Sequence, residues 1–258
     1  MLCEETPTQF AADLHESFIE PSPRSPTSQG PMTKHLLRDL ENLKKQVLLV
    51  GSLVEGAILK ATTALLERRP ELAAEVLHGD DAIDSREVMV EEECLKILAL
   101  HQPVAIDLRL VIAVIKINND LERIGDLAVN IAERAIFLAA RPPVDFAFDF
   151  AAMSLKTRNM LKQALDAFVN LDSSLAQQVC AADYEVDEMN RRIYPSVHEA
   201  IRRQPDRLED LLHLLSVSRY LERIADHATN IAEDVIYLNE GEIVRHRAKG
   251  FRAKKEGT

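Results

Sequence analysis

Apolar residues recur at alternating steps of four and three along two long stretches of the chain. The first stretch, within residues 103–140, places them at Leu110, Val114, Ile117, Leu121, Ile124, Ala128, Ile131, Ala135 and Leu138. The second, within 205–239, places them at Leu214, Val217, Leu221, Ile224, Ala228, Ile231, Val235 and Leu238. This spacing puts the residues on one helix face and is typical of helices that pack in bundles. We therefore expect two bundle helices here.

Prolines divide the rest of the chain into helices of similar length. A helix tends to end before a proline, and a new one begins with proline in its first turn. The expected helices are 33–68, 70–100, 103–140, 147–178, 181–203 and 205–239. The boundary between the fourth and fifth helices, near residues 179–182, has no Pro or Gly to mark it, and Pro195 predicts a kink within the fifth.

Composition favours an all-α fold. The apolar 47% is mostly aliphatic, with 5% aromatic residues and 8 glycines in 258 residues. The net charge of −11 would repel a phosphate backbone, so we expect no nucleic-acid partner. The excess of acidic residues would attract cations. The three cysteines include no CxxC pair, which fits a reducing compartment.

The two ends differ from this helical middle. Residues 1–31 hold five of the eleven prolines and show no periodicity, which predicts a disordered extension, with Met32 as an alternative start. Residues 242–258 form a basic tail. The start has no secretory pattern, and the most apolar stretch, 111–117, is too short to span a membrane. These features predict a cytoplasmic protein with no transmembrane segment.

An internal repeat links the two halves. Residues 118–138 and 218–238 are identical at 12 of 21 positions without a gap. The identities include the polar residues Glu122, Arg123, Asp126 and Asn130, which packing alone would not preserve. Residues 80–84 and 183–187 also resemble each other, so the repeat covers three helices in each half. The expected fold is two tandem three-helix bundles, residues 32–142 and 143–241.

Each half carries two acidic pairs with members four residues apart. The pairs are Asp80 with Asp84, Glu122 with Asp126, Asp183 with Asp187, and Glu222 with Asp226. Residues four apart lie on one helix face, so each pair directs two like charges the same way. A solvated surface would explain any one pair, but not four copies in a duplicated chain.

These pairs are mirror-related about the predicted helix turns. The mirror is Pro103 in the first half and lies between Gln204 and Pro205 in the second. In an antiparallel hairpin, Asp84 should therefore lie level with Glu122, and Asp80 level with Asp126. Four carboxylates would meet on the surface of each bundle, because the neighbouring seam residues take the core. A multivalent cation would relieve their repulsion.

Three readings of these clusters stay open. The first is a metal-bearing adaptor, the second a carboxylate-bridged metalloenzyme, and the third a structural repeat without metal. Glu87 and Glu91 prolong the acidic face but have no second-half equivalents, so we do not assign them as ligands. His227 has Leu127 as its counterpart, which argues against a ligand shared by both sites.

The chain resembles the PhoU family of phosphate-signalling regulators. The resemblance rests on QPVAIDLRLVIAVIKINNDLERIGDLAVNIAE (102–133), LERIADHATNIAE (221–233) and VIYLNEGEIVRH (235–246), and it covers nearly all of 33–246. Its most specific part is the E(D)xxxD signature, matched here at Asp80/Asp84, Glu122/Asp126, Asp183/Asp187 and Glu222/Asp226.

The resemblance implies several further properties. The acidic pairs would hold multinuclear metal clusters, one per bundle, of iron, zinc, manganese or magnesium. The protein would be a cytoplasmic homodimer that restrains phosphate uptake and phosphate-starvation signalling. Its expected partners are the ATPase subunit of the Pst phosphate transporter and the PhoR sensor kinase. We expect no enzymatic activity.

Overall fold

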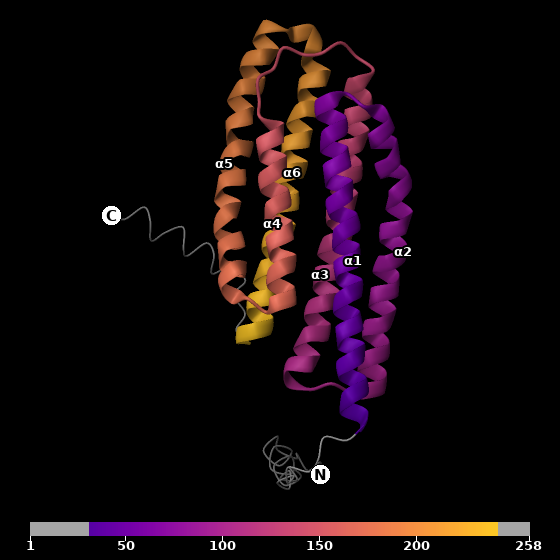
Figure 1. Ribbon diagram of the computed structural model, residues 1–258. Helices are drawn as coiled ribbons and strands as arrows, with labels where there is room; N and C mark the ends of the chain where they lie inside the picture. The colour runs from indigo at the N-terminus through magenta and orange to yellow at the C-terminus, as the bar shows by residue number, and fades with distance from the viewer. Residues whose placement is uncertain (1–30, 242–258) are drawn as a thin grey trace, which may run out of the picture.

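The computed structural model describes residues 31–241, which form six long helices (Figure 1). They are α1 (Pro31–Glu67), α2 (Pro70–His101), α3 (Ala105–Ala139), α4 (Phe150–Asn170), α5 (Ser173–Arg203) and α6 (Leu208–Glu240). A short 3-10 turn, η1 (Pro205–Arg207), precedes α6, and the described part of the chain contains no strand. The expectations for residues 1–30 and 242–258 lie outside the described residues.

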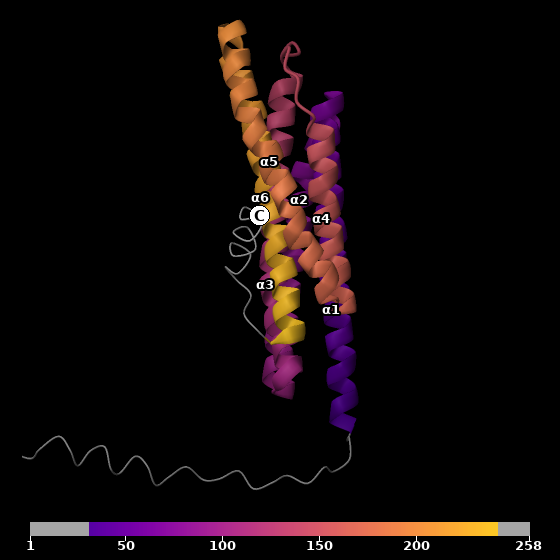
Figure 2. The same cartoon turned by 90° about the vertical axis from the view of Figure 1, so that its left-hand side faces the viewer.

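The helices form two three-helix bundles, as the repeat predicts. Helices α1, α2 and α3 pack on one another, and so do α4, α5 and α6. The bundles are joined along their length, because α3 packs against α6 and α1 against α4. Figure 2 shows α1 and α4 on one side of the molecule and α3 and α6 on the other. A single core runs through both bundles.

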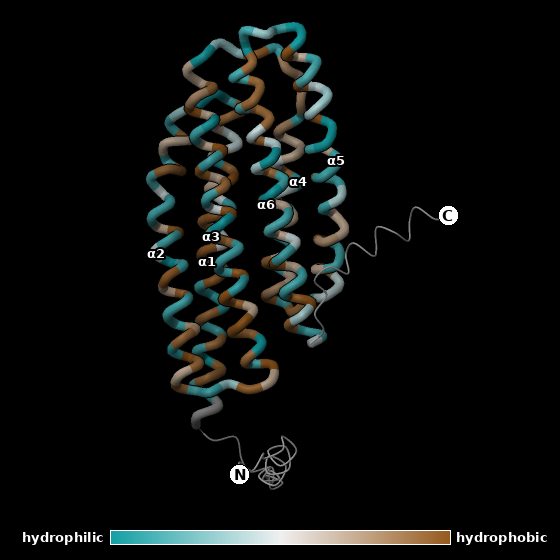
Figure 3. Tube along the Cα trace, turned by 180° about the vertical axis from the view of Figure 1, so that it is seen from behind, coloured by the Kyte–Doolittle hydropathy of each residue, from teal (hydrophilic) through white to brown (hydrophobic). Residues whose placement is uncertain are grey.

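The heptad pattern marks the buried face of both central helices. All nine seam residues of α3 are buried, and Leu214 is the one seam residue of α6 that is not fully buried. Hydrophobic and hydrophilic segments are interspersed along the helix traces in Figure 3. Burial of this aliphatic face is the main term that stabilises the fold.

The boundary between α4 and α5 differs from the expectation. We expected helices over 147–178 and 181–203, but α4 ends at Asn170 and α5 begins at Ser173. Leu171 adopts a left-handed conformation at φ 52° and ends α4. Asp172 then caps α5, its carboxylate accepting hydrogen bonds from the backbone N–H groups of Ser174 (2.9 Å) and Leu175 (3.0 Å). Helix α5 continues through Pro195.

Helix α1 gives a result that the search for apolar runs did not predict. Residues Lys34–Glu67 form one helix that is long and apolar enough to cross a membrane, by length and composition alone. In the fold, α1 packs against α2, α3 and α4. Its apolar residues Leu43, Val47, Val50 and Val54 are fully buried there. The most apolar window of this helix is 44% buried in the fold, while Leu49, Leu53 and Leu59 remain exposed.

Helices α3 and α6 run antiparallel across the join between the bundles. Lys116 Nζ lies 3.0 Å from Asp234 Oδ1, and the Phe137 and His213 rings contact each other further along. The contact at a higher residue number on α3 falls at a lower residue number on α6, as antiparallel helices require. At this register the repeat-equivalent residues Gly125 and Ala225 lie level with each other. The two halves are therefore related by an approximate twofold axis. The α2–α3 and α5–α6 turns accordingly lie at opposite ends (Figure 1).

Candidate metal centres

The first candidate centre lies on the hairpin of α2 and α3. Asp80 and Glu122 are half-buried, whereas Asp84 and Asp126 are exposed. The core-facing neighbours Leu121 and Ile124 are fully buried, so these carboxylates flank the seam. This is the surface position that the heptad predicts.

Carboxylates on the two helices of this hairpin influence one another across the helix pair, as the level pairing predicts. Burial, followed by Asp84 and then Asp126, raises the pKa of Asp80. Burial and then Asp126 raise the pKa of Glu122 against the opposing effect of Arg123, with a further increase from Asp84. Asp126 therefore acts on Asp80 and Asp84 acts on Glu122 across the two helices. Such mutual repulsion destabilises the cluster unless a cation neutralises it.

The cluster adjoins a surface cavity of about 320 Å³, which extends it further along α2. Its lining residues are Asp84, Glu87, Val88, Asn119, Glu122 and Arg123. We did not assign Glu87 from the sequence because it has no acidic counterpart in the second half. Its spacing of three residues from Asp84 was the signal, since residues three apart share a helix face.

The second candidate centre lies on the hairpin of α5 and α6. Asp183, Asp187 and Glu222 are half-buried and Asp226 is exposed. Burial, then Asp226 and then Asp187, raises the pKa of Glu222 against the opposing effects of Arg219 and Arg223. Asp187 therefore acts across the hairpin on Glu222, as the mirror relation predicts.

Cys180 lies beside this second centre as a protonated thiol. Burial raises its pKa to about 12, with Glu233 and Asp183 adding to the effect. A thiol with so high a pKa is a poor nucleophile at neutral pH. Burial likewise raises the pKa of Cys94 to about 12.

The donor set fits a hard or borderline cation. Each centre is built from carboxylates, the oxygen ligands that such cations prefer. In the conformation described for residues 31–241, no three His, Cys, Asp or Glu side chains are gathered closely enough to hold an ion. The buried carbonyl Oδ1 of Asn118, next to Glu87, has no hydrogen-bond partner. The kind of oxygen donor in each centre therefore suits such a cation.

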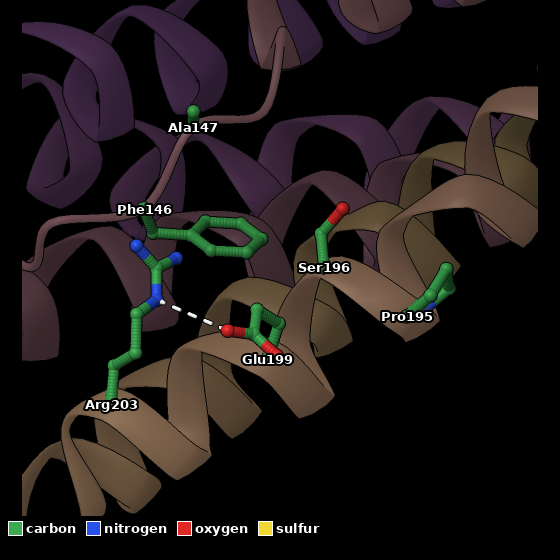
Figure 4. A pocket seen from close by; sticks show the side chains of 6 residues that line it. All are labelled: Phe146, Ala147, Pro195, Ser196, Glu199 and Arg203. Carbon is green, nitrogen blue, oxygen red and sulfur yellow. Dashed lines mark ion pairs between the residues drawn. The ribbon is translucent and has the colours of Figure 1, made fainter.

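Another cavity, of about 400 Å³, lies where the α3–α4 linker meets α5. Phe146 and Ala147 line it from the linker, and Pro195, Ser196, Glu199 and Arg203 line it from α5 (Figure 4). Arg203 Nε lies 3.9 Å from Glu199 Oε1, so its two charged groups face each other. The Ser196 hydroxyl in this cavity donates to the backbone carbonyl of Arg192 at 3.2 Å, and Glu199 faces Arg203.

Comparison with known proteins identifies the family. The family model "PhoU domain" matches residues 47–135 and again 150–235, which places one copy on each bundle. The chain belongs to the PhoU family. The two matches coincide with the internal repeat and with the two acidic hairpins. Both the fold and the family therefore agree with the resemblance read from the sequence.

Relatives and solved structures resemble the chain over most of its length. It is 44% identical over 212 residues to the Phosphate-specific transport system accessory protein PhoU homolog of Aquifex aeolicus, covering 82% of this chain and 96% of that protein. The crystal structure of PhoU from Pseudomonas aeruginosa matches with a TM-score of 0.78 at 37% identity, covering 80% of this chain and 100% of that one. The PhoU structure from Streptococcus pneumoniae matches with a TM-score of 0.72 at 30% identity, covering 81% and 99%.

Proposed function

We propose that this protein is a non-enzymatic regulator that restrains phosphate uptake and phosphate-starvation signalling. Its similarity to proteins named as accessory to a phosphate-specific transport system supports this role. The duplicated acidic hairpins are the single structural observation that carries it. They offer binding sites on the surface of a helical scaffold, which suits an adaptor better than a catalyst, since catalysis needs convergent acid, base or nucleophilic groups.

In this proposal the carboxylates of each hairpin hold a metal cluster. Asp80, Asp84, Glu122 and Asp126 would hold the first, and Asp183, Asp187, Glu222 and Asp226 the second. The bound metal would neutralise the repelling carboxylates and stabilise the native state by linkage. Iron, zinc, manganese and magnesium all accept such ligands.

The partners proposed are the ATPase subunit of the Pst transporter and the PhoR sensor kinase. The protein would act in the cytoplasm as a homodimer and bridge these partners. The family membership and the names of the relatives support this assignment.

A deletion strain tests the regulatory role. We expect phosphate-starvation reporter genes to stay active in phosphate-rich medium when the gene is removed, and the full-length chain to restore repression. The tagged protein should co-purify with the transporter ATPase or the kinase. Reporters that remain repressed in the deletion strain, with neither partner retained, would overturn the assignment and favour the metalloenzyme.

Elemental analysis tests the metal separately. The full-length protein is purified without chelator, alongside a variant with Glu122→Gln and Asp126→Asn. Because the second hairpin keeps its ligands, bound metal should fall by about half. Unchanged metal content in the variant would contradict the assignment of these residues.

A further inference from the structure

The two acidic hairpins differ at one pair of facing positions. The first hairpin has Glu87 on α2 and Asn118 on α3, whereas the equivalent positions of the second have Asn190 and Ser218. In the second hairpin the buried Ser218 Oγ donates a hydrogen bond to Asn190 Oδ1 at 2.9 Å. Asn190 and Ser218 are thus uncharged and hydrogen-bonded to each other. The same place in the first hairpin carries a carboxylate.

Asn118 holds the Glu87 side chain in place. Asn118 is only 1% exposed, and its Nδ2 donates to the Glu87 backbone carbonyl at 2.9 Å and to Glu87 Oε1 at 3.2 Å. The buried Oδ1 of the same carboxamide has no hydrogen-bond partner. Native proteins seldom leave a buried carbonyl oxygen unsatisfied, and amide oxygens are common ligands of hard cations.

Glu87 faces the same cavity as two of the predicted ligands. The cavity of about 320 Å³ is lined by Asp84 and Glu122 as well as Glu87. Burial raises the pKa of Glu87, and Glu91 and then Asp84 add to the effect. The affinity of an oxygen-ligand site rises with the number of charged ligands. Because Asn190 replaces Glu87 in the second hairpin, the first hairpin offers one more charged ligand at this position.

We propose that Glu87 is a fifth carboxylate ligand of the first cluster and that this cluster binds divalent cations more tightly than the second. Asn118 acts as a positioning residue that orients Glu87 toward the cavity. The inference rests on the proposed metal-binding role of the hairpins.

Calorimetric titration of the metal-stripped, full-length protein with Mn²⁺ alone tests this difference. We expect two classes of binding site. Glu122→Gln with Asp126→Asn should abolish the tighter class, and Glu222→Gln with Asp226→Asn should abolish the weaker one. Loss of the tighter class from the second pair of substitutions, or a single class in the unmodified protein, would overturn the proposal.

The variant Glu87→Gln tests the ligand itself. It should weaken the tighter class by roughly tenfold or more and leave the weaker class unchanged. Glu92→Gln removes the same charge from an exposed position on α2 and should change neither class. Asn118→Ser copies the second hairpin and should weaken the tighter class while Glu87 remains. Circular dichroism confirms that each variant keeps its helices.

The outcomes separate this inference from the proposed function. If the unmodified protein binds no Mn²⁺, both the metal-binding role and the inference fail. If it binds Mn²⁺ and Glu87→Gln leaves the tighter class unchanged, the inference alone fails.

Discussion

His227 Nδ1 on α6 lies 2.7 Å from Asp120 Oδ1 on α3, and this hydrogen-bonded contact joins the two bundles. Both side chains are largely buried, at 16% and 13% exposed, and Asn230 Nδ2 donates to the same oxygen at 3.3 Å. The repeat counterparts of these two residues are Leu127 and Tyr220, which cannot form such a pair. His227 therefore contacts Asp120 across the join between the bundles and not the predicted metal ligands. The two halves differ in this contact.

In the metal-free protein, the acidic hairpin of α2 and α3 should contribute less stability as pH rises. Asp80 and Glu122 have pKa values raised above their ordinary 3.8 and 4.5, so the folded state binds more protons than the unfolded state above those values. Stability then falls as pH rises through the raised pKa values. Asp80→Asn with Glu122→Gln should raise Tm of the chelator-treated protein at pH 7, with the gain vanishing near pH 4.

The matched control for that measurement is Glu41→Gln, an exposed position on α1. It should leave Tm nearly unchanged at both pH values. An equal gain in Tm from Glu41→Gln would mean that lowering the overall negative charge, not relief of the hairpin, produces the effect.

Asp210 should contribute stability that is lost in acid. Burial alone would raise its pKa, but hydrogen bonds from Arg207 and Arg141 outweigh burial and lower it. A lowered pKa gives stability above the ordinary value of 3.8 that disappears as pH falls through the folded-state pKa. Urea titration of Asp210→Asn should show reduced stability at pH 7. If the difference from the unmodified protein is as large at pH 3 as at pH 7, the ion pairs are not its source.

Lys116 and Asp234 should couple the two bundles. Asp234 is 2% exposed at the side chain, and Lys116 Nζ lies 3.0 Å from it. Lys116→Met should lower the free energy of unfolding by about 1–3 kcal/mol, because it removes one partner from a buried carboxylate. Adding Asp234→Asn should cost less in the Lys116→Met background than alone. Additive effects in this double-mutant cycle would show that the pair is not coupled.

Asp172 should stabilise the start of α5. Its carboxylate accepts two backbone hydrogen bonds there, so Asp172→Ala should cost about 1 kcal/mol in chemical denaturation. Asp172→Ser keeps a capping oxygen and should restore most of the loss. If the serine variant is as unstable as the alanine variant, capping is not the function of this side chain.

The α4–α5 boundary shows where sequence reasoning was limited. Prolines located the other turns closely, but Leu171 adopts a left-handed conformation that glycine more commonly supplies. The signal that remained was Asp172 followed by two serines, an N-cap pattern. The boundary predicted near residues 179–182 has neither Pro nor Gly, and the structure places the break at residues 171–172 instead.

The acidic hairpins were more predictable than the join between the bundles. The positions of Asp84 and Glu122 follow from helical rise and one proline turn, so arithmetic along the chain locates them. Contacts such as Asp120 with His227 depend on how two independent bundles are placed against each other. No local sequence pattern encodes that placement. Because Asp120 and His227 have different residue types as repeat counterparts, aligning the two halves does not reveal their contact.

The approximate twofold axis between α3 and α6 bears on how such a chain can diverge after duplication. In a dimer of two identical bundles, every contact across the axis occurs twice, so each surface must complement itself. Covalent fusion removes that constraint. Lys116 faces Asp234 on one side of the axis, while their counterparts, Ser216 and Arg134, do not form the matching ion pair. After fusion, the first half can therefore carry a lysine and the second half the aspartate that pairs with it. Such a one-sided pair makes the two halves no longer interchangeable in the assembled protein.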